Sequence, residues 1–294
     1  MKHTLSILTL LAVLSLPLQA QQLKGLSLTV DAGLMIPNAK QAEFYRGLDG
    51  YPNTINRVLH SQQYGIEIWN RLVNEGLISP SAIPSYSALQ VVEYGKMDFR
   101  LTYQIGVGIR YDYPSGFGWL LRFDFSQLTA AGQFQLSSNN GTGILGSNQY
   151  VTCDIYGQEK RIFIDLGLTR RFTLSERLDL ELDLGFDLNN TKVTNHAIRI
   201  PSESSDISIL DIWGGRTPDV GTGTYEYVNQ GGIGIGGFGT LALSYKFRGA
   251  AVDVGYTASY TQTKYTDFND DDCFALQHTV LLRFHINNFS FFGK

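Results

Sequence analysis

Apolar and polar residues alternate strictly along residues 97–113, and the pattern resumes after a short break. Every odd position there is large and apolar, from Met97 to Tyr113, and every even position is polar, charged or glycine. A period of two is typical of an extended strand, whose successive side chains point to opposite faces. The Pro-Ser-Gly segment at residues 114–116 predicts a turn. We therefore expect a long β-hairpin with one apolar and one polar face, ending near Phe125.

The length of this pattern points to a membrane rather than to a soluble sheet. Strands in soluble proteins average about 5–6 residues, whereas a transmembrane strand needs about 9–11 tilted residues with an apolar lipid face. The sharpest alternation lies over residues 178–188, where leucines alternate with Asp179, Glu181 and Asp183. A helix would bring these charges into its apolar face. We interpret such segments as the walls of a membrane barrel.

Eight segments of the chain fit this description. They cover residues 25–36, 96–113, 117–136, 150–172, 177–200, 225–247, 251–262 and 274–287. Long connections follow the first, third, fifth and seventh segments, and short ones follow the second, fourth and sixth. Bacterial single-chain barrels have an even strand number, short periplasmic turns and longer outer loops. The sequence thus predicts an all-β fold: an eight-stranded antiparallel transmembrane β-barrel with long outer loops, the first partly helical.

Two of the long connections are candidates for contact with partners. In the first, residues 37–95, apolar residues recur at helical spacing over residues 64–77. These residues are Ile66, Trp69, Leu72, Val73 and Leu77. We expect a partly helical cap over the barrel mouth. The third connection is the polar segment of residues 191–223. Long loops in compact folds are usually functional or packed on themselves.

The amino terminus has the pattern of a secretory signal peptide. Lys2 and His3 precede an apolar run, and Ala20 offers a small residue for cleavage. We divide the chain into a signal peptide, residues 1–20, and one barrel domain, residues 21–294. The mean hydropathy of −0.07 and the lack of a later long apolar run argue against a helical membrane protein. A net charge of −4 gives no reason to expect nucleic acid as a partner.

Charged residues fall mainly on the face that would line the barrel. The predicted lumen network consists of Arg100, Arg110, Asp112, Arg122, Asp124, Arg161, Asp165, Asp179, Glu181, Asp183 and Arg283. An eight-stranded barrel is only wide enough for its inward side chains to fill it. We therefore expect a salt-bridged interior that satisfies buried charge. The alternative is a narrow polar channel.

Other chemistry has weaker support in the sequence. A rim enzyme would need a base such as histidine beside a serine or aspartate, and His196 with Ser202 is a pairing that no flanking motif supports. We expect no enzyme activity, no cofactor and no metal. Cys153 and Cys273 lie near predicted strand ends in an exported chain, so a disulfide between them is geometrically feasible, although sequence alone does not decide pairing.

From residue 26 to its end, the chain resembles the small outer-membrane β-barrel superfamily of Gram-negative bacteria, the OmpX/OmpW/PorT-like group. The signal peptide, the alternating strands and the aromatic-rich last strand carry this resemblance. One departure is that Phe291 and Phe292 are followed by Gly293 and Lys294, where the family usually ends on an aromatic residue. The resemblance implies an outer-membrane location after cleavage near Ala20, with outer-membrane lipid and the barrel-assembly machinery as partners.

The function we expect is that of a surface binding or scaffold component without a solute-sized pore. Such a protein could be a subunit of a larger envelope assembly and contact other envelope proteins through its outer loops. Two alternatives stay open at this point. One is a rim-acting enzyme that modifies outer-membrane lipid, and the other is a small polar channel.

Overall fold

The computed structural model describes residues 25–49, 53–78, 89–138, 150–201, 206–209, 217–218, 225–226, 230–247, 250–265 and 274–286. The predicted signal peptide lies outside these residues. Among the described residues, no helix is long and apolar enough to cross a membrane.

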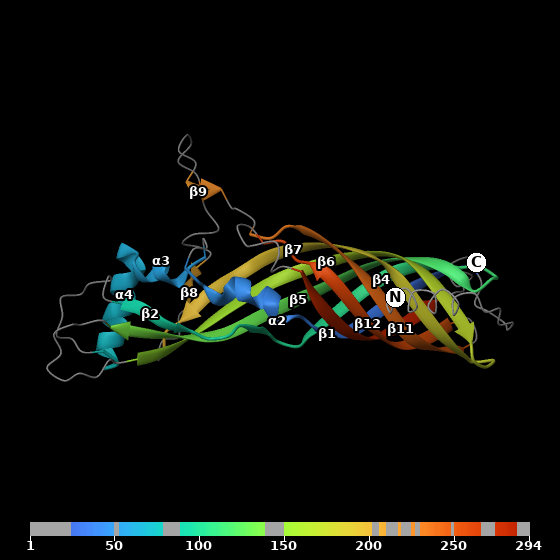
Figure 1. Ribbon diagram of the computed structural model, residues 1–294, viewed down its shortest axis with the longest axis horizontal. Coiled ribbons are helices and arrows are strands. Elements are labelled where there is room, and N and C mark those ends of the chain that lie inside the picture. The colour runs from blue at the N-terminus through green and yellow to red at the C-terminus, as the bar shows by residue number, and fades with distance from the viewer. Residues whose placement is uncertain are drawn as a thin grey trace, which may run out of the picture.

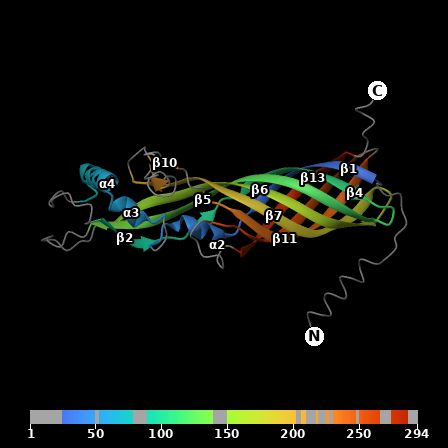
Figure 2. The same cartoon turned by 90° about the horizontal axis from the view of Figure 1, so that it is seen from above.

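Eight antiparallel strands form a closed ring (Figures 1 and 2). They are β1 (Gly25–Ile36), β4 (Thr102–Asp112), β5 (Phe117–Ser138), β6 (Tyr150–Thr173), β7 (Leu178–Arg199), β11 (Ile233–Phe247), β12 (Ala250–Gln262) and β13 (Phe274–Ile286). Each pairs with the next in this order, and pairing of β1 with β13 closes the ring. The predicted eight-stranded antiparallel barrel is confirmed.

The two faces of the ring differ as the alternation predicts. On β7, Asp179, Glu181 and Asp183 are fully buried, whereas Leu184 and Phe186 face outward. The same outward apolar face recurs on every strand of the ring. Because an apolar exterior belongs in lipid and closure pairs the strand edges, the ring is a transmembrane barrel.

Short turns mark one end of the barrel. Between β4 and β5, the turn is closed by the Tyr113 amide, which donates to the Phe117 carbonyl at 2.7 Å. Gly116 has a left-handed φ of 79° there, which glycine adopts without steric cost. The turn from β6 to β7 and the paired strand ends Phe247 of β11 and Ala250 of β12 lie at the same end. By the rule for bacterial barrels, this end faces the periplasm.

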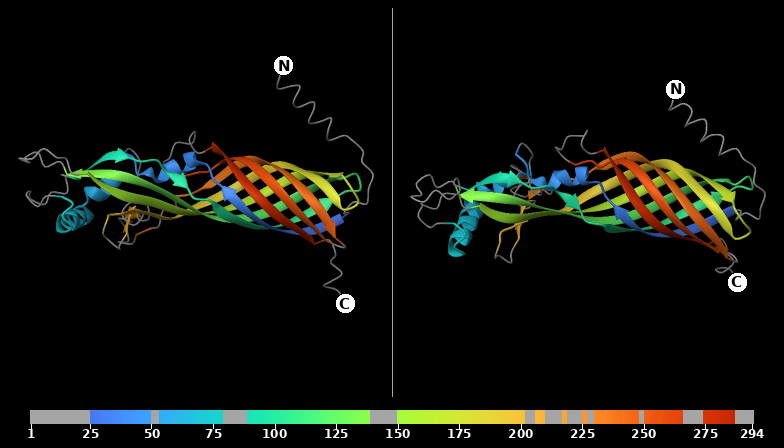
Figure 3. Two further views of the ribbon diagram at one scale, coloured as in Figure 1. Left: turned by 90° about the horizontal axis from the view of Figure 1, so that it is seen from below. Right: turned by 60° about the horizontal axis from the view of Figure 1, so that its bottom comes forward.

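At the opposite end, strands and helices continue beyond the ring of the barrel (Figure 3). Strands β5, β6 and β7 run on past the ring, with β2 (Leu89–Tyr94) and β3 (Asp98–Phe99) paired to β5 and β8 (Ile207–Ser208) paired to β7. The first long connection also forms α2 (Ala39–Ala42), the 3-10 helix η1 (Glu43–Arg46), α3 (Ile55–Leu59) and α4 (Gln62–Asn74). We call this extension the outer arm. It consists of α3, α4, β2, β8 and the outer ends of three long strands, namely residues 127–138 of β5, 150–160 of β6 and 192–199 of β7.

Helix α4 shows why the insert is helical. The Ser61 hydroxyl caps its first turn by accepting from the Tyr64 amide at 3.1 Å. Trp69 and Leu72 are buried against the arm. The inclusion of Ile66 in the apolar face was wrong, because its side chain is 39% exposed. Ile68, two residues further along and four residues before Leu72, lies in the core instead.

The long strand predicted over residues 96–113 is interrupted by a β-bulge. Phe99 pairs with Ala130 and Gln104 pairs with Ser126, so this side carries one residue more than β5 between the two pairs. The extra residue exchanges the two faces. As a result Met97 is buried inside, and the placement of Arg100 in the lumen was wrong, because its side chain is exposed outside.

The sixth strand also differs from the prediction at its start. β11 begins at Ile233 instead of residue 225. The preceding β10 (Tyr225–Glu226) pairs with β9 (Thr217–Pro218) in a separate two-stranded sheet. Those residues therefore leave the barrel wall, although their sequence is compatible with strand.

We predict that Leu166→Arg destabilises the protein strongly. Leu166 lies midway along the lipid face of β6 and is 58% exposed. An arginine at the bilayer midplane of a barrel costs about 2–4 kcal/mol. The free energy of unfolding in lipid vesicles, measured with a denaturant, should fall by that amount. Thr152→Arg, on the water-exposed arm part of the same strand, is the control and should change it by less than about 0.5 kcal/mol. Equal effects of the two variants would contradict the lipid face.

Candidate functional site

A cluster of buried polar side chains closes the outer mouth of the barrel. Its centre is Glu159 on β6, whose carboxylate accepts from the Tyr45 hydroxyl at 2.6 Å and from the Tyr265 hydroxyl at 2.8 Å. Arg161 lies next to it, with Nε at 2.5 Å from Glu159 Oε1. The Arg161 Nη1 also donates to Gln41 Oε1 at 2.8 Å. We call these five residues the mouth cluster.

The mouth cluster receives Gln41 and Tyr45 from the first long connection. Even a single Cβ atom at residue 157 would collide with the Tyr45 ring, so only glycine fits at this position. His196 faces the ring edge-on at a centroid distance of 5.3 Å. Its Nε2 lies 3.0 Å from the Tyr45 carbonyl oxygen. The sequence places a small residue and a histidine where the inserted tyrosine requires them, so this segment is held inside the mouth.

The phenols of the mouth cluster stay protonated. Burial, followed by the charge of Glu159, raises the pKa of Tyr45 well above its ordinary value. Burial and Glu159 act in the same direction on the pKa of Tyr265. Since both hydroxyls donate to one carboxylate, they remain hydrogen-bond donors throughout the physiological pH range.

Below the mouth, charged pairs fill the barrel. Arg283 connects opposite walls, because its Nε donates to Asp31 Oδ1 and its Nη1 to Asp183 Oδ2, both at 2.9 Å. Glu181 pairs with two guanidinium groups: Arg110 Nη1 lies 2.5 Å from Oε2, and Arg171 Nε lies 2.7 Å from Oε1. This arrangement satisfies buried charge by pairing across strands.

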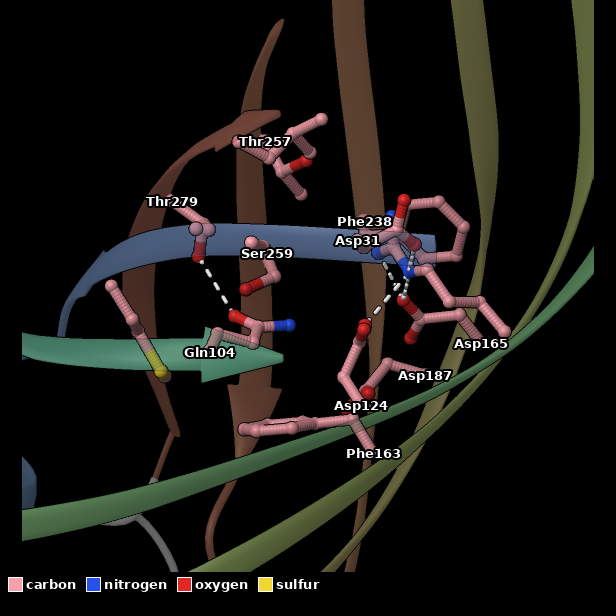
Figure 4. Close-up of a pocket in the computed structure, with 15 residues that line it drawn as sticks. Asp31, Gln104, Asp124, Phe163, Asp165, Asp187, Phe238, Thr257, Ser259 and Thr279 are labelled. Carbon is pink, nitrogen blue, oxygen red and sulfur yellow. Dashed lines mark hydrogen bonds and ion pairs between the residues drawn. The ribbon is translucent and has the colours of Figure 1, made fainter. Parts of the chain in front are cut away.

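One small cavity lies within this interior (Figure 4). Its volume is about 30 Å³, and Asp124, Asp165 and Asp187 are among its lining residues. Arg122 is the nearest cation, with Nε 2.7 Å from Asp124 Oδ2 and 3.1 Å from Asp165 Oδ2. A water needs about 10–15 Å³ of such space. The cavity therefore has room for about two waters and is too small for a solute.

Three buried side chains could in principle hold a metal ion. Ligand atoms of Glu181, Asp253 and His285 lie within 4.8 Å of one another. However, both Glu181 oxygens already accept from guanidinium groups, His285 contacts Asp253, and Arg283 lies 3.9 Å from Asp253. The guanidinium groups of Arg110, Arg171 and Arg283 already supply the positive charge that a metal ion would bring. Glu181, Asp253 and His285 are therefore better explained as part of the charge network than as metal ligands.

The structure brings most of the predicted lumen residues together. Those placed inside the barrel are Arg110, Asp112, Arg122, Asp124, Arg161, Asp165, Asp179, Glu181, Asp183 and Arg283, all buried. Arg100 is the exception described above. Glu159 was missed, although its inward position follows from the alternation on β6. Gln41 and Tyr45 were missed as well, and no pattern in the insert signals that they enter the barrel.

The remaining candidate residues are placed only in part. Cys153 is buried in the outer arm, and Cys273 lies outside the described residues, so their disulfide stays a prediction. Ser202 also lies outside them. His196 is fully buried, and besides Tyr45 its Nδ1 lies 3.5 Å from the Asn53 side-chain nitrogen. Both ring nitrogens thus face groups of the inserted segment.

We predict that Glu159→Gln lowers the free energy of unfolding by more than the removal of a charge at an exposed position does. The substitution leaves the Arg161 guanidinium buried without its counter-charge, which typically costs about 3–5 kcal/mol. Denaturant unfolding in vesicles measures the loss. Glu75→Gln, at the exposed end of α4, is the matched control and should stay within about 0.5 kcal/mol of wild type. A Glu159→Gln protein as stable as the control would show that the mouth cluster is not formed.

Comparisons with known proteins give structural likeness only. No family model matches the chain, and no curated protein matches it. Among solved structures, Neisserial surface protein A has a TM-score of 0.41 and 8% identity over 90% of this chain and 98% of that one. The attachment invasion locus protein Ail of Yersinia pestis, in complex with the heparin analogue sucrose octasulfate, has a TM-score of 0.35 and 10% identity over 90% and 98%.

The geometry of the chain itself determines what kind of protein it is. The ring closes through β1 and β13, its lipid face is apolar, and Glu159, Arg161 and the paired charges below them fill its interior. An even number of antiparallel strands with short turns at one end is the architecture of bacterial outer-membrane barrels. The chain is a small eight-stranded outer-membrane β-barrel with an ordered outer arm.

Proposed function

We propose that the protein is a surface binding or scaffold component, anchored by its barrel in the outer membrane of a Gram-negative bacterium and engaging a partner with its outer arm. The observation that carries this proposal is the second apolar core outside the membrane. A barrel that served only as an anchor would need no such core. A folded platform outside the bilayer supports specific contact with another envelope protein.

The outer arm is built like a small soluble domain. Its helix α4 contributes Ile68, Trp69 and Leu72 to a core that also contains Phe134 of β5 and Ile155 of β6. All of these side chains are nearly inaccessible to solvent. Burial of each such side chain contributes about 1.5–3 kcal/mol relative to exposure. The arm is therefore held in one conformation, as a binding surface requires.

Polar contacts fix the connections of the arm as well. The Arg46 Nη2 donates to the Tyr94 carbonyl at 3.0 Å and ties η1 to β2. The Asp49 carboxylate accepts from the Thr54 hydroxyl at 2.8 Å and from the Asn56 side-chain Nδ2 at 2.9 Å. These bonds join Asp49, in the described residues after η1, to the start of α3. Order in a long surface connection favours recognition over a simple linker.

The filled interior argues against the channel alternative. A permeating ion would have to pass the mouth cluster, where Glu159 and Arg161 are fully buried and mutually paired. It would then meet the paired groups around Arg283 and Glu181. Displacing buried pairs of this kind costs several kcal/mol per charge. We propose that the barrel does not conduct.

The enzyme alternative has no support in the described side chains. Its candidate base, His196, holds the Tyr45 carbonyl within 3.0 Å inside the mouth. It is fully buried beneath the inserted segment, so substrate on the lipid surface has no access to it. A general base must reach the proton that it removes. We assign His196 a structural role.

The test is site-specific photo-crosslinking in native membranes. A photoreactive residue at Val92 on β2, 48% exposed, or at Ile66 on α4 should give a discrete protein adduct. The same residue at Val107, which is 58% exposed on the lipid face of β4, is the control and should give lipid adducts alone. The proposal is contradicted if the arm positions give no adduct and the purified protein conducts in planar bilayers.

A further inference from the structure

Three lysines stand outside the barrel at one level. Lys160 on β6, Lys192 on β7 and Lys264 after β12 are all exposed on the outer surface. On these strands the charged groups within the bilayer zone face the lumen, so outward ammonium groups at this height are unusual. We call Lys160, Lys192 and Lys264 the lysine row.

Lys160 and Lys192 are directly opposite each other in the β6–β7 ladder. Cβ atoms of directly opposed residues lie about 4.5–5.5 Å apart, and like charges in such pairs are destabilising. The outward residues flanking them along the ladder, Gln158, Asn190 and Thr194, are uncharged. Gln127 of β5, which pairs with Lys160, is uncharged as well. Within the described part of the chain, neither ammonium forms an ion pair.

Lys264 continues the row on the next ribbon. The Thr191 amide, beside Lys192, donates to the Gly232 carbonyl at 3.0 Å. Gly232 has no side chain, and Lys264 occupies the space above it: a Cβ built there would lie 3.3 Å from the Lys264 Cγ. The aliphatic part of Lys264 thus packs over Gly232, whose carbonyl is bonded to β7. Lys160, Lys192 and Lys264 therefore lie at one level on three neighbouring segments.

The lysine row lies where the apolar belt ends. The next outward residue of β6 toward the periplasm is Ile162, and Ile233 lies at the same level on β11, with Asn190 of β7 paired to both. The outward residue of β7 after Asn190 is Leu188, and all three apolar side chains are large and exposed. Toward the arm the outward residues are polar. This end carries the outer arm, so the row lies at the headgroup level of the outer leaflet, where lysines extend from an apolar surface into the interface.

We propose that the lysine row binds the phosphate group of a phosphorylated lipid in the outer leaflet, whose acyl chains lie along Ile162, Leu188 and Ile233. The phosphate oxygens accept charge-assisted hydrogen bonds from the ammonium groups. One anion between Lys160 and Lys192 removes the repulsion of the opposed pair. A soluble polyanion would meet the charges alone, whereas a lipid also matches the apolar belt directly below them.

The test measures lipid binding to the full-length protein refolded in a zwitterionic detergent. Phosphatidic acid and diacylglycerol with the same acyl chains are the two probes, and native mass spectrometry gives their affinities. Wild type should prefer phosphatidic acid. The double variant Lys160→Gln/Lys192→Gln should bind it about thirtyfold more weakly, since each surface lysine contributes about 1 kcal/mol toward an anionic lipid. Its affinity for diacylglycerol should not change.

Two controls make the result specific. Lys160→Arg/Lys192→Arg should keep the preference, and Lys96→Gln, which removes an exposed charge from the arm side of the protein, should leave it intact. Unchanged binding of phosphatidic acid by the Gln double variant overturns the proposal. So does competition by dextran sulfate or inorganic phosphate at the same affinity as phosphatidic acid, because the acyl chains would then be irrelevant.

Discussion

Hydrocarbon cannot hydrogen-bond to a peptide group, and this constraint governs the whole molecule. Every backbone group in the bilayer must be paired within the protein, which the β1–β13 pairing achieves by closing the ring. Charges on the strands must then point inward and pair there. Arg283 pairs with Asp31 and Asp183 and so connects three strands across the interior. A shift of the strand pairing by one residue would point these charged groups toward lipid. The network therefore fixes the register of the strands, whatever its net contribution to stability.

The long strands pass through two environments, and both of their faces change character at the same level. On β6 the inward face carries Arg161 and Glu159 and then Ile155 and Cys153, while the outward face changes from Ile162 to a polar surface. In the bilayer the apolar face is outside, and beyond it the apolar face is inside, where the helices of the arm cover it. One continuous strand is thereby a barrel wall and a support for a soluble core. The mouth cluster lies where the two regimes meet, and it separates the lumen from the outer solvent.

Sequence periodicity was sufficient for the barrel but not for its mouth. Around Asp179, Glu181 and Asp183 the alternation allows only one orientation of the strand in lipid, with the carboxylates toward the lumen. These side chains were predicted to lie inside the barrel, and they are fully buried. Arg100 was misplaced because Met97 and Phe99 are apolar and suit either face, which conceals the bulge that follows them. Tyr45 enters the barrel through tertiary contacts with Glu159 and Gly157, which are distant in sequence. No local pattern encodes such a contact.

The most direct test of the central claim is the accessibility of spin labels along residues 178–188 of β7 in lipid vesicles. Molecular oxygen concentrates in hydrocarbon, and a polar nickel chelate stays in water. Labels at even positions such as Leu182 and Leu184 should collide with oxygen and be protected from the chelate, while labels at Glu181 and Asp183 should be protected from both. High oxygen accessibility at the odd positions, or chelate accessibility at the even ones, would contradict a barrel with a lipid-facing apolar exterior and a packed, charged interior.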